Sequence, residues 1–287
     1  MTLRELIKDA EQKKVALGHF NISDIVALRA IVQAALKLKL PVLIGVSEGE
    51  RKFLGTKTVA SLVRSLREEL NIPLFVNADH VHSLESLREA VAAGYDSVIF
   101  DAAQLSFEEN VKKTKEAVEY VKSKNPGIVV EGELGYIGSA SQLLDAVPEG
   151  ALTQASELTK PEEAARFVKE TGVDLFAPAV GNLHGMLKNI PNPRLDVKRI
   201  KEIKNAVPIP LVLHGGSGIQ DEDFVKAIDA GISIIHINTE LRKAWRQGVE
   251  EALQENPEEV APYRLLAPAF DKIEQLVESR LRLFNRS

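Results

Sequence analysis

The chain has 287 residues, of which 45% are hydrophobic and 27% are charged, and its formal net charge is −5. This length and composition permit a full hydrophobic core, whereas the interspersed acidic and basic residues leave no basic stripe for nucleic acid or an anionic membrane. Because the sequence has no cysteine, disulfides and thiolate ligands are excluded, and any bound metal must be held by imidazole and carboxylate groups.

Short apolar segments alternate with longer amphipathic segments along the whole chain, which is typical of repeated βα units around a parallel sheet. The amphipathic segments place apolar residues on one helical face, as Val59, Leu62, Val63, Leu66 and Leu70 do. We predict eight strands, at Val15–Asn21, Val42–Ser47, Leu74–Asp79, Ser97–Asp101, Ile128–Glu133, Asp174–Val180, Leu211–His214 and Ser233–Asn238.

Local signals indicate where several of the predicted helices begin and end. Two Ser/Thr-x-x-Glu capping boxes predict helix starts at Ser106 and Thr159. Three glycines that stand between a helical run and the next strand predict helix ends, at Gly94, Gly172 and Gly231. These signals fix the alternation of helices and strands at several independent points.

Eight strands with interleaved helices favour a closed (β/α)₈ TIM barrel, in which the active site is built from the loops that follow the strands. We expect one such domain over residues 1–287, with a terminal helix at Pro262–Phe284 as a C-terminal extension. An open doubly wound sheet is the alternative, but no Gly-x-Gly-x-x-Gly turn follows the first strand. Two long connections, Leu134–Leu158 and Gly181–Pro193, are candidate lids or binding loops.

All six histidines lie at the ends of predicted strands, and none lies in a predicted helix. They are His19, His80, His82, His184, His214 and His236. A barrel would bring His80, His184 and His214 to one rim, and three neutral imidazoles with an open position form a catalytic zinc arrangement. For each histidine alone, the alternative is a hydrogen-bonded loop residue.

Acidic residues follow the predicted strands at the same rim. Strand alternation places His80 and His82 on one side and Asp79 on the other, unless the strand ends there. Asp101 and the pair Glu131 and Glu133 end the next two strands, where they could be further ligands, partners of ligands or bases. The alternative for Glu131 is a structural ion pair inside the barrel mouth.

Two segments beside the histidines predict a phosphate site. Gly215, Gly216 and Ser217 offer exposed backbone amides after strand seven, and Asn238 and Thr239 open the helix after strand eight. Barrel phosphate sites are commonly formed by these two loops and a helix N-terminus. Ordinary helix capping is the alternative role for Asn238 and Thr239.

From about Ala16 to its end, the chain resembles the class II, metal-dependent ketose-bisphosphate aldolases, the fructose-1,6-bisphosphate and tagatose-1,6-bisphosphate aldolase family. The resemblance rests on several short motifs that occur in the order of this family. They are Phe20-Asn21, Val46-Ser47-Glu48-Gly49, Asp79-His80, Asp101, Glu131-Gly132-Glu133-Leu134-Gly135, Gly181-Asn182-Leu183-His184-Gly185, His214-Gly215-Gly216-Ser217 and Thr239-Glu240-Leu241-Arg242.

The resemblance implies a role for each matching residue. His80, His184 and His214 would bind one catalytic Zn²⁺, while Asp101 and Glu133 match a second or displaced metal site; a second divalent or a monovalent cation stays open. Asp79 would exchange a proton with the C4 hydroxyl of the substrate. The substrate pocket would comprise Asn21, Ser47, Gly185, Lys188, Gly215, Gly216, Ser217, Asn238 and Thr239.

The implied activity is that of an aldehyde-lyase. Such an enzyme would reversibly cleave a ketose 1,6-bisphosphate, such as fructose 1,6-bisphosphate, into dihydroxyacetone phosphate and an aldehyde such as glyceraldehyde 3-phosphate. The reaction would pass through a zinc-stabilised enediolate. We expect a cytoplasmic protein, because the start of the chain lacks the apolar segment of a signal peptide and no run approaches a membrane span. The terminal helix and the resemblance to the family imply a homodimer or tetramer.

The chain departs from the family at four places, one of which is an extra His82 after the Asp79-His80 pair. Ala103 and Gln104 follow Asp101 where the family usually has serine, and His236 replaces a substrate-site asparagine. The loop at residues 138–142 lacks the family's acidic residue, for which Asp145, Glu149 and His236 are candidate replacements. These departures leave two alternatives open: a related metal-dependent lyase or isomerase acting on another phosphorylated sugar, and a non-catalytic sugar-phosphate-binding homologue.

Overall fold

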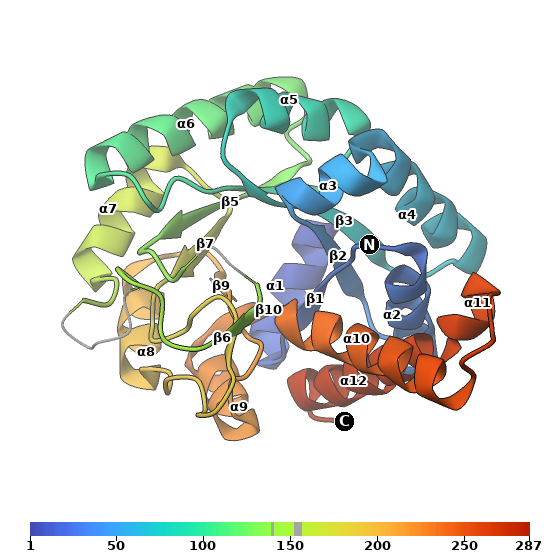
Figure 1. The fold of residues 1–287 in the computed structure, drawn as a ribbon. Helices are drawn as coiled ribbons and strands as arrows, with labels where there is room; N and C mark the ends of the chain where they lie inside the picture. Colours follow the sequence, from blue (N-terminus) through green and yellow to red (C-terminus); the bar gives the residue numbers. More distant parts are fainter. Residues whose placement is uncertain (139–140, 152–156) are drawn as a thin grey trace.

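Parallel strands close into a barrel in the computed structural model, which describes residues 1–138, 141–151 and 157–287. The barrel strands are β1 (Leu17–Asn21), β2 (Val42–Val46), β3 (Leu74–Val81), β4 (Ser97–Phe100), β5 (Val129–Leu134), β7 (Leu175–Pro178), β9 (Leu211–Leu213) and β10 (Ile232–Ile237). They are ordered β1-β10-β9-β7-β5-β4-β3-β2 around the closed sheet (Figure 1). The predicted TIM barrel is confirmed, and the alternative of an open doubly wound sheet is wrong.

The predicted strands match the barrel strands, with ends that differ by one or two residues. The first strand begins at Leu17 rather than at the predicted Val15. The reason is that the amide of Val15 donates to Ala10 O and the amide of Ala16 donates to Phe284 O, so neither joins the sheet. Strand ends therefore depend on partners that lie far away in the sequence.

Helices surround the barrel on its outer side (Figure 1). Their bounds are α2 (Ile25–Leu38), α3 (Glu48–Leu54), α4 (Thr56–Leu70), α5 (Leu84–Ala93), α6 (Phe107–Lys124), α7 (Pro161–Thr171), α8 (Val197–Ala206) and α9 (Asp221–Ala230). The capping box of Ser106 and Glu109 starts α6 as predicted. Gly94, Gly172 and Gly231 follow α5, α7 and α9, also as predicted.

The predicted capping box at Thr159 is wrong. Lys160 is the N-cap of α7, and it makes no side-chain cap hydrogen bond. The Thr159 hydroxyl instead donates to Leu134 O at 2.7 Å and accepts from the amide of Ala179 at 2.9 Å. This side chain therefore links the ends of two barrel strands rather than starting a helix.

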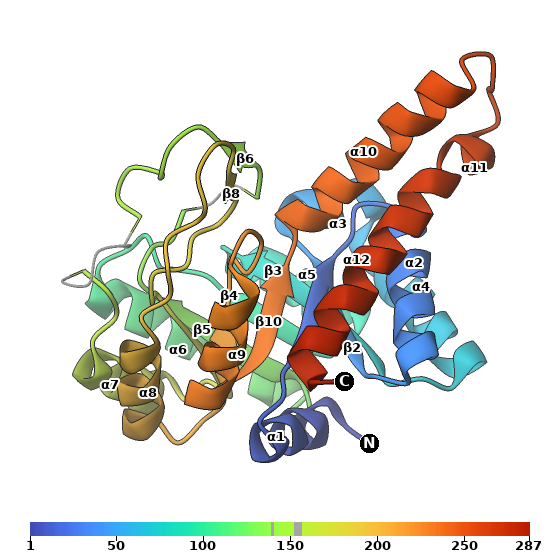
Figure 2. The ribbon, with the colours of Figure 1, turned by 90° about the horizontal axis from the view of Figure 1, so that it is seen from below.

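One helix that the sequence analysis did not predict, α1 (Leu3–Lys13), closes the N-terminal end of the barrel (Figure 2). Its Leu3, Leu6, Ile7 and Ala10 pack against inward-facing strand residues. These are Leu17, Leu43, Phe75, Val129, Leu175, Ala177, Val212 and Ile234. Because apolar side chains fill this end, ligands can enter only at the end where the strands finish.

The C-terminal part forms a helical arm from α10 (Thr239–Glu255), α11 (Pro262–Leu265) and α12 (Ala267–Asn285). The predicted single helix at Pro262–Phe284 is thus wrong: it is interrupted at Leu266, because Pro268 in the first turn of α12 has no amide hydrogen to continue the preceding helix. In Figure 2, α10 and α12 run side by side and project beyond the barrel. Among the described residues, no helix is long and apolar enough to cross a membrane.

Close packing within the arm requires a glycine in α10. A Cβ atom at Gly248 would lie 2.4 Å from the Cα atom of Ala269. Only hydrogen at this position lets the two helix backbones approach so closely. Helix α12 also packs against α2, so that the arm is joined to the start of the barrel.

The two predicted long loops meet in a small second sheet. β6 (Leu143–Leu144) pairs in parallel with β8 (Met186–Leu187). Leu144 and Leu187, one from each of these strands, form an apolar cluster with Leu183. The pair stands above the open end of the barrel (Figure 2), and we call residues 141–151 and 181–192 the lid. Residues 139–140 of the expected acid-free loop lie outside the described residues.

Candidate metal centre and active site

A cavity of about 340 Å³ opens where the barrel strands finish. It is lined by residues from several loops, including Asp79, His80, Asp101, His184 and Arg242. A narrower pocket continues from it towards the ends of β9 and β10. The structure thus brings the predicted histidines and acids together at one rim.

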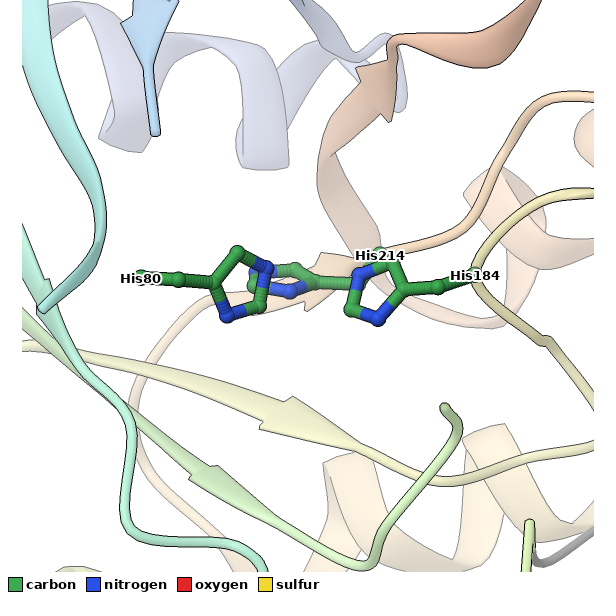
Figure 3. A group of neighbouring side chains, drawn as sticks. All are labelled: His80, His184 and His214. Carbon is green, nitrogen blue, oxygen red and sulfur yellow. The ribbon is translucent and has the colours of Figure 1, made fainter. Parts of the chain in front are cut away.

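Three of the six histidines point towards one another in this cavity (Figure 3). His80 lies in β3, His184 lies in the loop after β7, and His214 follows β9. The ring centroids are 4.8 Å apart for His80 and His184, 5.1 Å for His80 and His214, and 5.8 Å for His184 and His214. Each ring offers one nitrogen to a common point, and these nitrogens lie within 4.8 Å of one another.

The other nitrogen of each ring has an outer partner. His184 Nδ1 donates to Gly138 O at 2.7 Å. His80 Nδ1 is 2.8 Å from Asp101 Oδ2, and His214 Nε2 is 2.6 Å from Glu131 Oε1. Carbonyl and carboxylate partners of this kind orient metal-binding imidazoles and leave the second nitrogen as a ligand.

Buried polar atoms around this point fit a cation. Among the described residues, His214 Nδ1, Glu133 Oε2 and Asp79 Oδ1 are buried and make no hydrogen bond, and His214 Nδ1 and Glu133 Oε2 lie 3.3 Å apart. A buried polar atom without a partner costs about 1–3 kcal/mol, and a metal ion would satisfy these atoms together. The donor set therefore fits zinc. Glu131 contacts the outer nitrogen of His214, an arrangement that fits both the ion pair and the ligand partner considered for this carboxylate.

The backbone at His80 explains how two neighbouring residues reach one cavity. His80 has a φ angle of 46°, which lies in the left-handed region that non-glycine residues seldom adopt. Both Asp79 and His80 line the cavity, although β3 continues to Val81. The expectation that Asp79 points to the opposite side is therefore wrong, because the left-handed residue breaks the strand alternation.

A buried arginine holds this strained strand end. The guanidinium of Arg51 donates through Nη1 to the carbonyl oxygens of Val46 and, at 2.9 Å, Asp79. Arg51 is only 2% exposed. It ties the end of β2 to the end of β3 immediately before His80. Arg51 Nη2 also donates to Ser86 Oγ at 3.3 Å. The sequence analysis missed this residue because its partners lie on other strands and helices and leave no local sequence pattern.

The carboxylates set the protonation of the histidines. Burial alone would lower the pKa of His80, but Asp79, Asp101 and Glu133 outweigh it and raise the pKa to about 9. The same balance, with Glu131 and Glu133 as the carboxylates, raises the pKa of His214 well above its usual value. Burial lowers the pKa of His184 to about 4, and the neighbouring His80 reinforces that effect.

One carboxylate oxygen of Asp79 accepts a hydrogen bond, and the other makes none among the described residues. Asn21 Nδ2 donates to Oδ2 at 2.8 Å. Oδ1 lies 3.7 Å from both His80 Nε2 and His236 Nδ1. Burial would raise the pKa of Asp79, but the histidines around it hold that pKa well below the usual value. The free oxygen is therefore ionised and available to accept a proton.

His236 lies between two other imidazoles. Its ring stacks on His19, with centroids 3.5 Å apart and an interplanar angle of 9°, and on His214, with centroids 4.2 Å apart. Burial, His19 and His214 lower its pKa well below the usual value, so it is neutral near pH 7. A Cβ atom at Gly45 would lie 2.1 Å from His19 Cε1, so this glycine makes room for the stack.

A hydrogen-bonded chain fixes the orientation of His19. Asn77 Nδ2 donates to Ser97 Oγ at 2.7 Å, so the amide oxygen of Asn77 faces His19 Nε2 at 3.1 Å. The sequence analysis placed His19 at a strand end, with a hydrogen-bonded residue as the alternative to a ligand, but it did not predict these partners. The pairing of the first and last barrel strands could have indicated that His19 lies beside His236, because the two residues share one register position.

Most of the predicted substrate residues line the cavity or its narrow pocket. They are Asn21, Ser47, Gly185, Gly215, Ser217, Asn238 and Thr239. Helix α10 begins at Thr239, where Ser217 Oγ accepts from the amides of Asn238 and Glu240. The Asn238 side chain makes no cap hydrogen bond. Capping at this helix start thus comes from Ser217, and the alternative role predicted for Asn238 is wrong.

Other predicted residues do not line the cavity. The amide of Gly216 donates to His236 O at 3.0 Å, so it is not free for a phosphate. Lys188 Nζ lies 2.9 Å from Asp145 Oδ1 on the lid. Asp145 and Glu149 are exposed. Of the three candidate replacements for the missing loop acid, His236 is the one that lines the pocket.

Comparison with known proteins identifies the family. The family model described as fructose-bisphosphate aldolase class-II matches residues 1–287. The chain belongs to the class II fructose-bisphosphate aldolase family. It is 38% identical over 290 residues to the fructose-bisphosphate aldolase of Geobacillus stearothermophilus, which covers 100% of this chain and 97% of that protein. It is 37% identical to the fructose-bisphosphate aldolase of Staphylococcus aureus strain N315, and this match covers 100% of this chain and 98% of that protein.

A solved structure extends this similarity to the fold of the aldolase family. The YdjI aldolase from Escherichia coli K12 has a TM-score of 0.83 and 32% identity, and the match covers 98% of this chain and 96% of that chain. The chain is therefore a class II aldolase, an enzyme of the aldehyde-lyase class. Zinc dependence is typical of this family, and the converging histidines fit it.

Proposed function

We propose that the protein is a zinc-dependent aldolase that reversibly cleaves fructose 1,6-bisphosphate into dihydroxyacetone phosphate and glyceraldehyde 3-phosphate. The observation that carries the proposal is the convergence of three imidazoles beside the free oxygen of Asp79. The names of the similar aldolases from Geobacillus and Staphylococcus support fructose bisphosphate as the substrate.

Each residue has a part in this reaction. His80, His184 and His214 would hold zinc, which supplies a Lewis acid for the substrate carbonyl when bound. Asp79 Oδ1 accepts the proton of the C4 hydroxyl as the C3–C4 bond breaks, and it returns this proton during synthesis. Asn21 keeps Oδ2 occupied, so that the two oxygens of Asp79 are not interchangeable.

The narrow pocket would receive the dihydroxyacetone phosphate end. Gly185, Gly215, Ser217, Asn238 and Thr239 surround it. His236 lines the same pocket and lies near Asp79. We assign it to the substrate at the position where the family usually has asparagine. Gly216 and Lys188 are left without a direct contact in this proposal.

A second cation position is part of the proposal. His80, Asp101 and Glu133 form another group whose ligand atoms lie within 4.8 Å of one another. This group shares His80 with the histidine set, so one ion would have to move or His80 would have to serve both positions. A carboxylate-rich position suits a displaced or second divalent ion.

Metal removal tests the function. Purified protein is treated with a chelator and assayed for cleavage of fructose 1,6-bisphosphate, and zinc or cobalt is then restored. We expect the loss and recovery of turnover to follow the metal content measured in the same samples. Activity that persists after complete metal removal would refute the proposal.

A variant of Asp79 separates chemistry from metal binding. Asp79→Ala is expected to retain zinc and to lose turnover by about 10²–10⁴-fold, the usual contribution of a general base. Asp229→Ala is the matched control, since this carboxylate is exposed on α9, outside the barrel. An unchanged rate in Asp79→Ala would remove the assigned role and favour a non-catalytic homologue.

A related lyase or isomerase acting on another phosphorylated sugar is the second candidate. His236 in the substrate pocket and Ala103 and Gln104 after Asp101 favour it, because they depart from the usual family residues. A panel of phosphorylated ketoses, assayed beside fructose 1,6-bisphosphate, distinguishes the two. Efficient turnover of fructose 1,6-bisphosphate would make this candidate unnecessary.

We also propose one domain over residues 1–287 and a homodimer or tetramer. Packing of α12 against α2 supports the single domain. Leu253, Val260 and Tyr263 support self-association, since they are large hydrophobic residues exposed near the end of the helical arm. Such exposed apolar side chains commonly mark an interface.

A further inference from the structure

A buried carboxylate next to the active site has no assigned role. Glu50, in α3, is 6% exposed. Its Oε2 accepts from Asn21 Nδ2 at 3.1 Å and from the amide of Ser47 at 2.7 Å. Its Oε1 accepts from Ser23 Oγ at 3.2 Å and from Arg242 Nη2 at 2.6 Å. Glu50 therefore joins four groups from different segments.

Asn21 connects Glu50 to Asp79. One amide nitrogen, Asn21 Nδ2, donates to both Asp79 Oδ2 and Glu50 Oε2. Both of its hydrogens are thus used on carboxylates. The reverse orientation of the amide would place its oxygen against two carboxylates, so the orientation of Asn21 is fixed. The position of Glu50 is transmitted to the Oδ2 atom of Asp79.

Arg242 holds the other end of this chain of contacts. It lies in α10 and reaches Glu50 with Nη2, while its Nη1 donates to Ser141 O of the lid at 2.9 Å. Its positive charge also offsets the second buried carboxylate near Asp79. Without it, Glu50 would lose its one ion-pair contact among the described residues, which is unfavourable for a buried carboxylate.

We propose that Glu50 and Arg242 are positioning residues that act on Asp79 through Asn21. The contact with Arg242 fixes Glu50, Glu50 fixes the amide of Asn21, and the amide holds Asp79 Oδ2. Oδ1 then keeps its direction towards the cavity. Because Arg242 also binds a lid carbonyl, the aspartate is held best when the lid is in the position described here.

Three variants test this arrangement in the full-length, zinc-loaded protein. Glu50→Gln preserves shape but has one acceptor oxygen, so it cannot accept from both Arg242 and Asn21. Arg242→Gln removes the charge, and Arg242→Lys keeps it. For Glu50→Gln and Arg242→Gln we expect kcat to fall about tenfold, with KM changed less than about twofold. Arg242→Lys should recover a substantial part of kcat.

A double variant adds a test of connection. If both residues act through one chain, Glu50→Gln combined with Arg242→Gln should lower kcat little more than either substitution alone. Arg246→Gln is the matched control, since Arg246 lies one turn further along α10 and its pair with Glu250 is exposed. Its kcat and KM should equal those of the unchanged protein.

The outcomes are distinct. A KM that rises with kcat unchanged in Arg242→Gln would overturn the inference and make Arg242 a substrate-binding residue. Loss of zinc or of folded protein in both Glu50→Gln and Arg242→Gln would also overturn it, in favour of a structural role. Multiplied effects in the double variant, or no recovery with lysine, would count against the chain of contacts.

The inference rests on the proposed function, because it assigns the proton of the C4 hydroxyl to Asp79. The two can fail separately. If the unchanged protein does not cleave ketose bisphosphates, the proposed function fails. If the unchanged protein is active and both Glu50→Gln and Arg242→Gln retain its kcat, only the positioning role fails.

Discussion

His80 combines an unfavourable backbone conformation with an unusual charge. A non-glycine residue in the left-handed region costs of the order of 1 kcal/mol, and the surrounding carboxylates raise the pKa of this imidazole to about 9. Arg51 supports the conformation from one side, and Asp101 holds the ring from the other. Zinc binding at this residue must therefore displace a proton.

The pKa values predict how zinc affinity depends on pH. Near pH 7 the metal-free protein carries protons on His80 and His214, whose pKa values are raised, while His184 is already neutral. Raising the pH towards about 9 removes the competing protons, so zinc affinity should increase about tenfold per pH unit for each proton displaced. Competition with a chromophoric chelator between about pH 6 and pH 8 measures this slope.

A variant and an independent readout support the pH measurement. Asp101→Asn removes one of the carboxylates that raise the pKa of His80, so the slope should become shallower. Proton release on zinc binding, measured by calorimetry in two buffers, should fall in the same variant. A zinc affinity independent of pH would contradict the protonation described for His80 and His214.

Sequence alone predicts the residues that converge at the candidate site but not the residues that orient them. His80, His184, His214 and Asp79 could be proposed because they lie in or after the ends of strands that must finish at one rim. Glu50 could have been noticed only through its Ser47-x-x-Glu50 spacing, which is a capping-box pattern. Its contacts with Asn21 and Arg242 join positions 29 and 192 residues away, and no local pattern encodes them.

At the scale of the elements, α1 is expected to stabilise the barrel without contributing to the site. Ile7 is 2% exposed and packs against the inward-facing strand residues at the closed end. Ile7→Ala should reduce the free energy of unfolding by about 2–5 kcal/mol, the usual cost of such a cavity.

Denaturant unfolding with zinc bound measures this cost. Lys8→Ala is the control, because Lys8 is the neighbouring exposed residue on the same helix. Zinc content per folded molecule should be unchanged in both variants. A loss of stability below about 1 kcal/mol in Ile7→Ala would show that α1 is not part of the core.

Barrel strands and short pairing strands differ in how well sequence predicts them. The barrel strands contain short apolar runs that are buried on both faces, so the sequence pattern reveals them. β6 and β8 have two residues each and exist because two loops meet. The interruption at Leu266 was missed for a different reason: the apolar spacing continues across it, although Pro268 prevents a continuous helix.

At the scale of the whole molecule, the helical arm carries large hydrophobic side chains that are exposed to solvent in the single chain. Val260 is 85% exposed and Tyr263 is 72% exposed. If the arm mediates self-association, Val260→Asp together with Tyr263→Asp should shift the protein to a smaller species in light scattering coupled to size-exclusion chromatography. Ile190→Asp, which changes another exposed hydrophobic residue but lies on the lid, should not. The same mass for all three proteins would exclude the arm as the interface.

The lid has a thermodynamic consequence for the metal. His184, one of the three proposed zinc ligands, lies within the lid, where its Nδ1 donates to Gly138 O and its amide donates to Ile137 O. Among the described residues, neither short strand of the lid pairs with another sheet. Ordering the lid and retaining the ion are thus linked equilibria, and linkage is reciprocal: whatever closes the lid must strengthen metal binding by the same factor. A substrate that closes the lid would therefore slow the loss of the zinc ion that the proposed function requires.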